Sequence, residues 1–127
     1  MTREEIYAQA KETFGAVPGW LSSAPDGVIQ QIWTIFGWNH TDGAISVRDK
    51  ALVAYGAAAA LHCKYCIPFH TAELMLAGVD EAGIKDASWA AETVAGLGTY
   101  LHGIGYDLDQ FLAELKAAGE YIMSQQK

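Results

Sequence analysis

Apolar residues recur along the chain at the spacing of α-helices, and no segment alternates convincingly in the manner of a β-strand. A first helix is expected between Thr2 and Gly15, because Thr2 and Glu5 form a capping-box pattern and a glycine suits a helix end. A second helix is expected from Pro25 onward. Residues 18–23, which lie between them, are expected to form a turn or a short helical piece.

The middle of the chain predicts the central helix of the fold. Ser46 and Asp49 resemble an N-terminal cap, and the helix that follows runs to Leu61 with almost no charge after Lys50. Its faces are apolar all round and rich in small side chains, which is typical of a buried helix that its neighbours approach closely. The helical pattern breaks at residues 62–65.

Three further helices complete the pattern. One begins near Pro68 and stops at Gly78, another begins at Asp80 or Asp86, and the last is capped by Asp107. On the helix before the last, the apolar positions expected to point inward are Val94, Leu97, Leu101 and Ile104. On the last helix, the apolar stripe consists of Leu108, Phe111, Leu115 and Ile122. The sequence therefore predicts an all-α fold of about six helices, in a single domain over residues 1–127.

Composition narrows the choice of partners. Hydrophobic residues make up 51% of a chain of only 127 residues, so we expect several copies to assemble. The net charge is −7 and the 8 basic residues are scattered, which argues against nucleic acid. The longest apolar run, residues 57–61, is far shorter than the roughly 20 residues of a membrane span. The first residues do not resemble a secretory signal, so a cytoplasmic location is expected.

The candidate chemistry lies at Cys63, Cys66 and His70. Two cysteines three residues apart at a helix start can form a small disulfide ring, and free amides there favour the reactive thiolate. His70 follows Cys66 by one helical turn and can exchange a proton with its sulfur. Glu73 lies on the same stripe and could orient His70. In the cytoplasm, a disulfide between the two cysteines would be transient or catalytic.

Two other interpretations fit this segment. Both cysteines could be small core residues, with His70 as an ordinary surface histidine. Alternatively, Cys63, Cys66 and His70 could bind a metal ion, but structural zinc usually needs four ligands. His62 or His40 would then have to complete the set, so we expect no metal and no cofactor.

The segment from Cys63 to Glu73, with Ala77 and Gly78, resembles the core motif of the carboxymuconolactone decarboxylase / AhpD-like (alkylhydroperoxidase) superfamily. The resemblance covers about residues 45–105. It implies an all-α fold that assembles into trimers or hexamers. It also implies a thiol peroxidase or disulfide reductase with Cys63 and Cys66 as redox pair and His70 as proton shuttle. The substrate would be a hydroperoxide or disulfide, and the reductant a dithiol such as a lipoyl-bearing protein.

One position departs from the hydroperoxidase pattern, in which a glutamate precedes the first cysteine by twelve residues. Here that position is Ala51, and the acids or bases that could replace it in space are Asp49, Glu73 and His40. The change weakens the expectation of peroxidase turnover and leaves disulfide exchange, which mainly requires a thiolate and a resolving thiol. The alternative is a small-molecule-binding or non-redox protein of the same family, whose cysteines are not catalytic.

Overall fold

The computed structural model describes residues 1–126, which form seven α-helices and no strand. The helices are α1 (Arg3–Phe14), α2 (Gly19–Ser22), α3 (Asp26–Asn39), α4 (Val47–Ala60), α5 (Cys66–Leu76), α6 (Glu81–Gly103) and α7 (Leu108–Ser124). The predicted all-α fold is confirmed. The expected number of about six helices was one too low, because the turn between the first two long helices closes into the separate helix α2.

Side-chain caps mark four of the seven helix starts within residues 1–126, those of α1, α4, α6 and α7. Thr2 forms the expected capping box at the start of α1, and Gly15 ends that helix in the left-handed conformation, with φ of 80°. Asp80, rather than Asp86, caps α6, because its carboxylate accepts a hydrogen bond from the amide of the third residue beyond it. Asp107 caps α7 in the same way.

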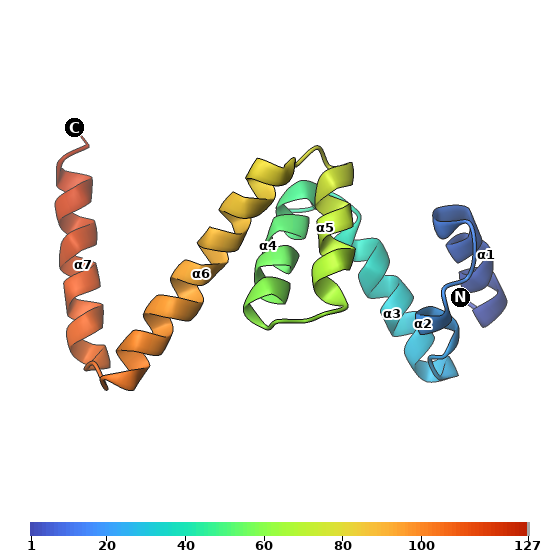
Figure 1. The fold of residues 1–127 in the computed structure, drawn as a ribbon, viewed down its shortest axis with the longest axis horizontal. Coiled ribbons are helices and arrows are strands. Elements are labelled where there is room, and N and C mark those ends of the chain that lie inside the picture. The colour runs from blue at the N-terminus through green and yellow to red at the C-terminus, as the bar shows by residue number, and fades with distance from the viewer. Residues whose placement is uncertain (127) are drawn as a thin grey trace.

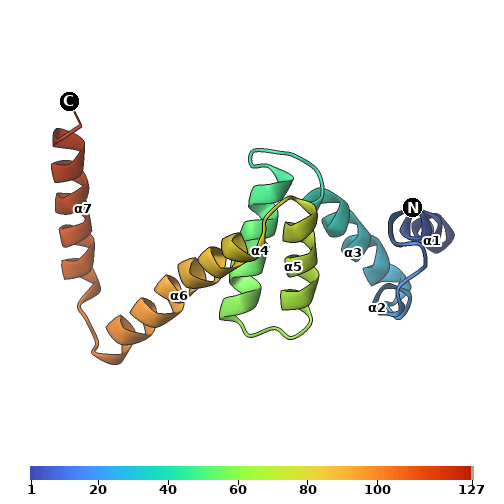
Figure 2. The same ribbon diagram turned by 45° about the horizontal axis from the view of Figure 1, so that its top comes forward.

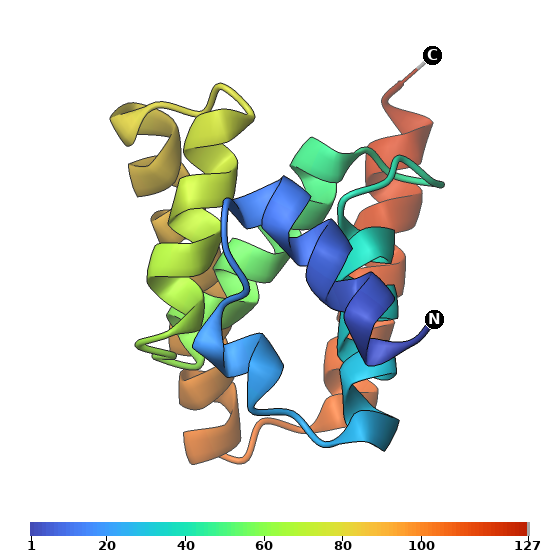
Figure 3. The ribbon, with the colours of Figure 1, turned by 90° about the vertical axis from the view of Figure 1, so that its right-hand side faces the viewer.

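Two separate hydrophobic cores organise the first five helices. The first lies among α1, α2 and α3 and consists of Ile6, Ala10, Leu21, Ile29 and Trp33. The second lies among α4, α5 and the start of α6 and consists of Ala51, Tyr55, Leu74 and Val79. α4 and α5 run side by side in the middle of the molecule, with α3 leading back to the first core (Figure 1). Seen from the α1 end, α3 and α5 stand on opposite sides behind α1 (Figure 3).

The start of α6 packs on α4, whereas the second half of α6 and α7 form an arm that extends away from both cores (Figures 1 and 2). Within residues 1–126, neither α6 nor α7 contains a buried residue, and α7 packs extensively on no other helix. The expectation that the apolar positions of α6 point inward was therefore wrong for the single chain at Val94, Leu97 and Ile104, and Leu101 is half-buried. The apolar stripe of α7 is also exposed: Leu108, Phe111, Leu115 and Ile122.

The physical reason is that periodicity marks an apolar face but does not say which segment covers it. The central helix α4 illustrates the same limit: Ala51, Tyr55 and Ala58 are buried, whereas Val53 on another face is 67% exposed. No helix in the described part of the chain has the length and apolar character to cross a membrane.

Candidate active site

A tight turn between α4 and α5 positions the first cysteine. The amides of His62 and Cys63 donate to the carbonyl oxygens of Ala59 and Ala58, at 3.1 and 3.0 Å, in a Schellman arrangement. His62 occupies the left-handed position of this turn, with φ of 55°, which more often belongs to glycine. The turn therefore fixes Cys63 just beyond the end of the central helix.

Cys63 and Cys66 are joined by a disulfide, with their Cα atoms 5.2 Å apart. Cys66 is the first residue of α5, and its backbone amide donates to the sulfur of Cys63 at 3.1 Å. The unpaired amides at a helix start carry a partial positive charge that stabilises a nearby thiolate. The pair thus has the geometry for reversible disulfide formation that its spacing predicted.

Glu73 joins two histidines from different helices. One carboxylate oxygen contacts Nδ1 of His70, one turn earlier on α5, and the other contacts Nε2 of His40 at the end of α3. The Glu73 side chain is only 18% exposed, so water competes weakly for these contacts. The structure therefore brings three of the predicted residues, His70, Glu73 and His40, into one hydrogen-bonded chain.

The contacts of His40 require a proton between its ring and Glu73. Its Nδ1 lies 2.7 Å from the carbonyl oxygen of Phe36, which only accepts, so Nδ1 carries hydrogen. Nε2 and the carboxylate of Glu73 then need one further hydrogen between them. One hydrogen shared by Nε2 of His40 and the carboxylate of Glu73 satisfies this contact.

The site lacks an acid at the position where the family pattern has one. Ala51 is 6% exposed and packs into the second core instead. Asp49 does not replace that acid, because it lies exposed in the first turn of α4 and shares no hydrogen bond or ion pair with the two histidines within residues 1–126. Glu73 supplies a carboxylate to His70 from the same helix.

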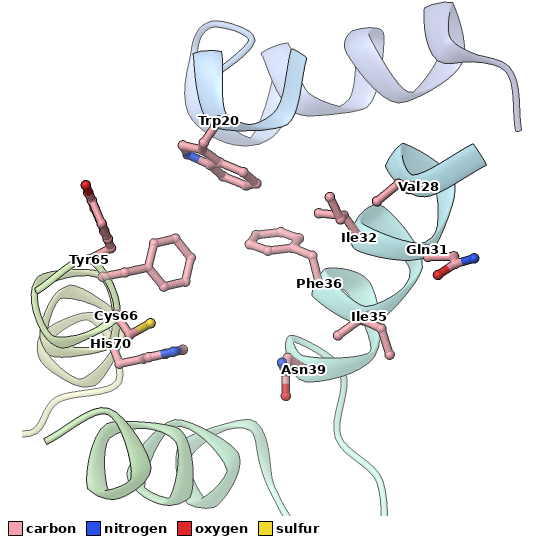
Figure 4. Close-up of a pocket in the computed structure, with 11 residues that line it drawn as sticks. Trp20, Val28, Gln31, Ile32, Ile35, Phe36, Asn39, Tyr65, Cys66 and His70 are labelled. Carbon is pink, nitrogen blue, oxygen red and sulfur yellow. The ribbon is translucent and has the colours of Figure 1, made fainter. Parts of the chain in front are cut away.

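A cavity of about 680 Å³ opens between α3 and α5, and Cys66 and His70 lie at its edge (Figure 4). The sulfur of Cys66 and the ring of His70 point toward the side chains of α3 (Figure 4). The rest of the lining is mainly apolar or aromatic: Trp20, Val28, Ile32, Ile35, Phe36, Tyr65 and Phe69, with Gln31 and Asn39 as polar members. An apolar molecule can thus reach the sulfur of Cys66.

Sequence reasoning missed the cavity residues, although some signals were present. Phe69 directly precedes His70, and its ring centroid lies 6.4 Å from that of Phe36 across the cavity region. Ile32, Ile35 and Phe36 recur at helical spacing on one face of α3. No sequence pattern predicted that Trp20 lines the cavity. It reaches the cavity from α2 only because of how the first three helices pack.

Within residues 1–126, no group of three or more histidine, cysteine, aspartate and glutamate side chains is arranged to hold a metal ion. The metal alternative considered from the sequence therefore has no candidate ligand set in this part of the chain. The two sulfurs on which it would depend are bonded to each other.

Comparison with known proteins agrees with the resemblance of the motif. A stretch of 76 residues is 33% identical to an alkyl hydroperoxide reductase of Mycobacterium tuberculosis (strain ATCC 25618 / H37Rv), covering 58% of this chain and 22% of that protein. The chain thus spans well under half of that relative, and no solved structure matches it. Residues 28–106 match the carboxymuconolactone decarboxylase family, a longer segment than the 45–105 expected. Because this match covers more than half of the chain and includes the cysteine pair, the protein belongs to the carboxymuconolactone decarboxylase family.

Proposed function

We propose that the protein is a thiol-dependent hydroperoxide reductase whose redox pair is Cys63 and Cys66. The observation that carries this proposal is the meeting of Cys66 and His70 at an apolar cavity, with the proton-holding Glu73–His40 pair behind His70. The name of the mycobacterial relative, an alkyl hydroperoxide reductase, supports the same reaction class. We place the activity in the cytoplasm, where reductants keep such cysteines available as thiols.

In the first step, the Cys66 thiolate attacks the terminal oxygen of a hydroperoxide. The O–O bond breaks, Cys66 becomes a sulfenic acid, and the departing alkoxide takes a proton from His70 and leaves as an alcohol. Cys66 is the attacking residue because it lines the cavity beside His70, whereas Cys63 does not line it. The apolar walls bury the organic part of the substrate.

In the second step, the sulfur of Cys63 attacks that of Cys66. The S–S bond forms as the sulfenic oxygen leaves with protons as water, which gives the disulfide state seen here. The amide of Cys66, which donates to the Cys63 sulfur, stabilises Cys63 as a thiolate for this attack. An external dithiol then reduces the disulfide by exchange and is itself oxidised. By analogy with the family, this reductant is a dithiol such as a lipoyl-bearing protein.

Glu73 and His40 restore the proton that His70 gives to the alkoxide. The proton held between His40 and Glu73 passes along the carboxylate to the ring of His70. This relay fulfils the need for an acid without a carboxylate at Ala51. His40 is partly exposed, so it can recover its proton from water.

A second candidate function is binding of a small apolar molecule without redox chemistry. It is favoured by the volume of the cavity, which falls in the range of about 300–1,000 Å³ typical of ligand sites. A ligand that raises the melting temperature of the Cys63→Ser/Cys66→Ser double variant, in a protein without peroxidase activity, would favour this candidate.

We also propose that copies of the chain assemble, with trimers or hexamers as the forms that the family resemblance implies. Support comes from the apolar side chains of α7 and of the second half of α6, such as Leu97 and Leu115, which stay exposed within the described residues. Such long exposed apolar faces on a single chain mark a site of association.

The deciding experiment follows turnover of an organic hydroperoxide with a dithiol reductant. Cys63→Ser and Cys66→Ser should each abolish it, and peroxide should convert the reduced wild type into the intramolecular disulfide by mass spectrometry. Full activity in either single variant would overturn the mechanism. Glu73→Gln should lower kcat about a hundredfold, the lower range for loss of general acid–base catalysis. Asp49→Asn, which removes an exposed acid outside the relay, is the matched control and should leave kcat unchanged.

A further inference from the structure

Lys50 is the one buried charged residue in the described part of the chain, with 6% of its surface exposed. No carboxylate forms an ion pair with it among residues 1–126. Burying an ammonium group without an opposite charge is costly, and an apolar side chain of similar size would avoid that cost. The groups that Lys50 contacts should therefore explain why a lysine is there.

Its contacts lie on the backbone around His40. The Nζ of Lys50 donates to the carbonyl oxygen of Trp38 at 2.9 Å and to that of Thr41 at 2.8 Å. It also lies 3.8 Å from the centroid of the Trp38 ring, a cation–π contact. One carbonyl belongs to the end of α3 and the other to the loop after it, so Lys50 fixes the backbone on both sides of His40.

His40 is the residue for which backbone position matters most in this segment. It caps the C-terminus of α3, and its ring must reach Glu73 on another helix. A cation also interacts favourably with the carbonyl oxygens at a helix end, which carry a partial negative charge. Lys50 sits on α4, which follows α3 in the chain and runs beside α5, and so ties the end of α3 to the middle of the molecule (Figure 1).

We infer that Lys50 is a positioning residue that holds His40 against Glu73 and thereby completes the proton relay to His70. The inference rests on the proposed function for its kinetic consequence, but the placement of His40 can be tested without turnover. It also gives a reason for a lysine next to Ala51: α4 contributes to the relay through a cation that orders a loop, not through an acid.

The structural test is NMR of the histidine side chains in the full-length protein. In the wild type, the ring of His40 should show close contacts to the side chain of Glu73. Lys50→Met should remove these contacts, whereas Lys50→Arg, which keeps charge and donors, should retain most of them. Lys85→Met is the matched control, because Lys85 is 72% exposed and pairs only with Glu81 on α6. Unchanged His40 signals in folded Lys50→Met would overturn the inference.

The kinetic test is a double-mutant cycle between Lys50→Met and His40→Gln. Each single variant should lower kcat about tenfold or more with little change in KM, as expected when a catalytic group is misplaced. The double variant should lose no more than His40→Gln alone, because Lys50 acts through His40. Independent, additive losses would show that Lys50 acts elsewhere and overturn the inference.

The inference stays testable if the wild type has no turnover or if Lys50→Met does not fold. If the wild type has no peroxidase turnover, the proposed function fails, and the NMR comparison still decides whether Lys50 positions His40. If Lys50→Met does not fold, Lys50→Gln replaces it, since its neutral side chain is too short to reach both carbonyl oxygens that Lys50 bonds. Wild-type contacts between His40 and Glu73 in folded Lys50→Gln, together with full kcat, would then contradict the inference.

Discussion

The first five helices and the arm, which consists of the second half of α6 and of α7, use apolar residues in different ways. α1 to α5 contain Ile6, Leu21, Ile29 and Leu74, whose side chains are almost completely buried. α6 and α7 are the longest helices of the chain, yet neither buries a residue. Both regions have helical apolar periodicity. The difference teaches that an amphipathic sequence specifies which face of a helix is apolar, but not which segment or subunit covers that face.

The candidate active site and the apolar surface of the arm lie in different parts of the molecule. All residues of the proposed relay and its redox pair lie on α3, α5 and the turns next to them. We therefore expect changes in the arm to alter assembly, and changes in the first five helices to alter stability or catalysis.

The largest effect on stability is expected from Leu74→Ala. Leu74 is 0% exposed in the second core, and removing such a leucine typically costs about 2–5 kcal/mol. Leu97→Ala in the arm, where the side chain is 58% exposed, should cost less than about 0.5 kcal/mol in dilute, dissociated protein. Urea denaturation of both variants measures this contrast, and equal losses would break it.

A comparable effect on assembly is expected from Leu115→Glu. Leu115 is 59% exposed on α7, and a carboxylate there should weaken association by about 2–3 kcal/mol if the stripe lies in an interface. Lys116→Glu changes the charge of the adjacent, polar position and should have a much smaller effect. Light scattering over a concentration series reports the mass, and an unchanged mass for Leu115→Glu would refute the assembly surface.

A smaller effect on stability distinguishes the N-terminal cap of α4 from that of α7. The hydroxyl of Ser46 caps α4, so Ser46→Ala should lower the free energy of unfolding by about 1 kcal/mol. Asp107→Ala removes the cap of α7, which packs on no core, so it should fray α7 without moving the main transition. Hydrogen exchange resolved along the chain distinguishes local fraying from global loss.

His62→Gly should stabilise the protein slightly. A non-glycine residue in the left-handed conformation destabilises the folded state by about 1 kcal/mol, and glycine would relieve this strain. The greater freedom of glycine in the unfolded chain offsets part of that stabilisation. His62→Ala keeps the strain and is the matched control. Thermal unfolding should rank glycine above the wild type, and a lower melting temperature for His62→Gly would contradict this.

The smallest effect concerns pH in the arm. The Tyr106 hydroxyl donates to Glu114 at 2.5 Å, and this hydrogen bond raises the pKa of Tyr106 above its usual value. The contribution of this contact to the stability of the folded state is therefore complete at pH values just below about 10, the ordinary tyrosine pKa. It is lost as the pH rises through the higher pKa of Tyr106 in the folded protein. Phenolate absorbance should show that Tyr106 titrates at lower pH in Glu114→Gln than in the wild type. Identical titration of Tyr106 in both proteins would exclude the contact.

Local chemistry explains which features could be predicted from the sequence. Thr2 and Asp107 mark helix starts because a cap acts on amides only a few residues away. Cys63, Cys66 and His70 were predictable for the same reason, since all three lie within two turns of chain. Their catalytic roles remain predictions.

The rest of the site depends on packing between distant segments. His40 meets Glu73 because α3 crosses near α5, and no periodicity in either helix encodes that approach. Asp49 was an equally good candidate in the sequence, but its place in the first turn of α4 leaves it in solvent. The apolar positions of α6 were mispredicted as inward-facing for a related reason: burial is a property of the finished assembly.

The cavity has a consequence for the cooperativity of unfolding. Its walls come from both sides of the molecule: Ile32 and Phe36 pack against the first core, and Phe69 lies on α5, the helix that contributes Leu74 to the second. A molecule bound there contacts both sides and stabilises only the state in which they are joined. Calorimetry of the protein without ligand is therefore expected to show two overlapping transitions, which a tightly bound occupant would merge into one at higher temperature.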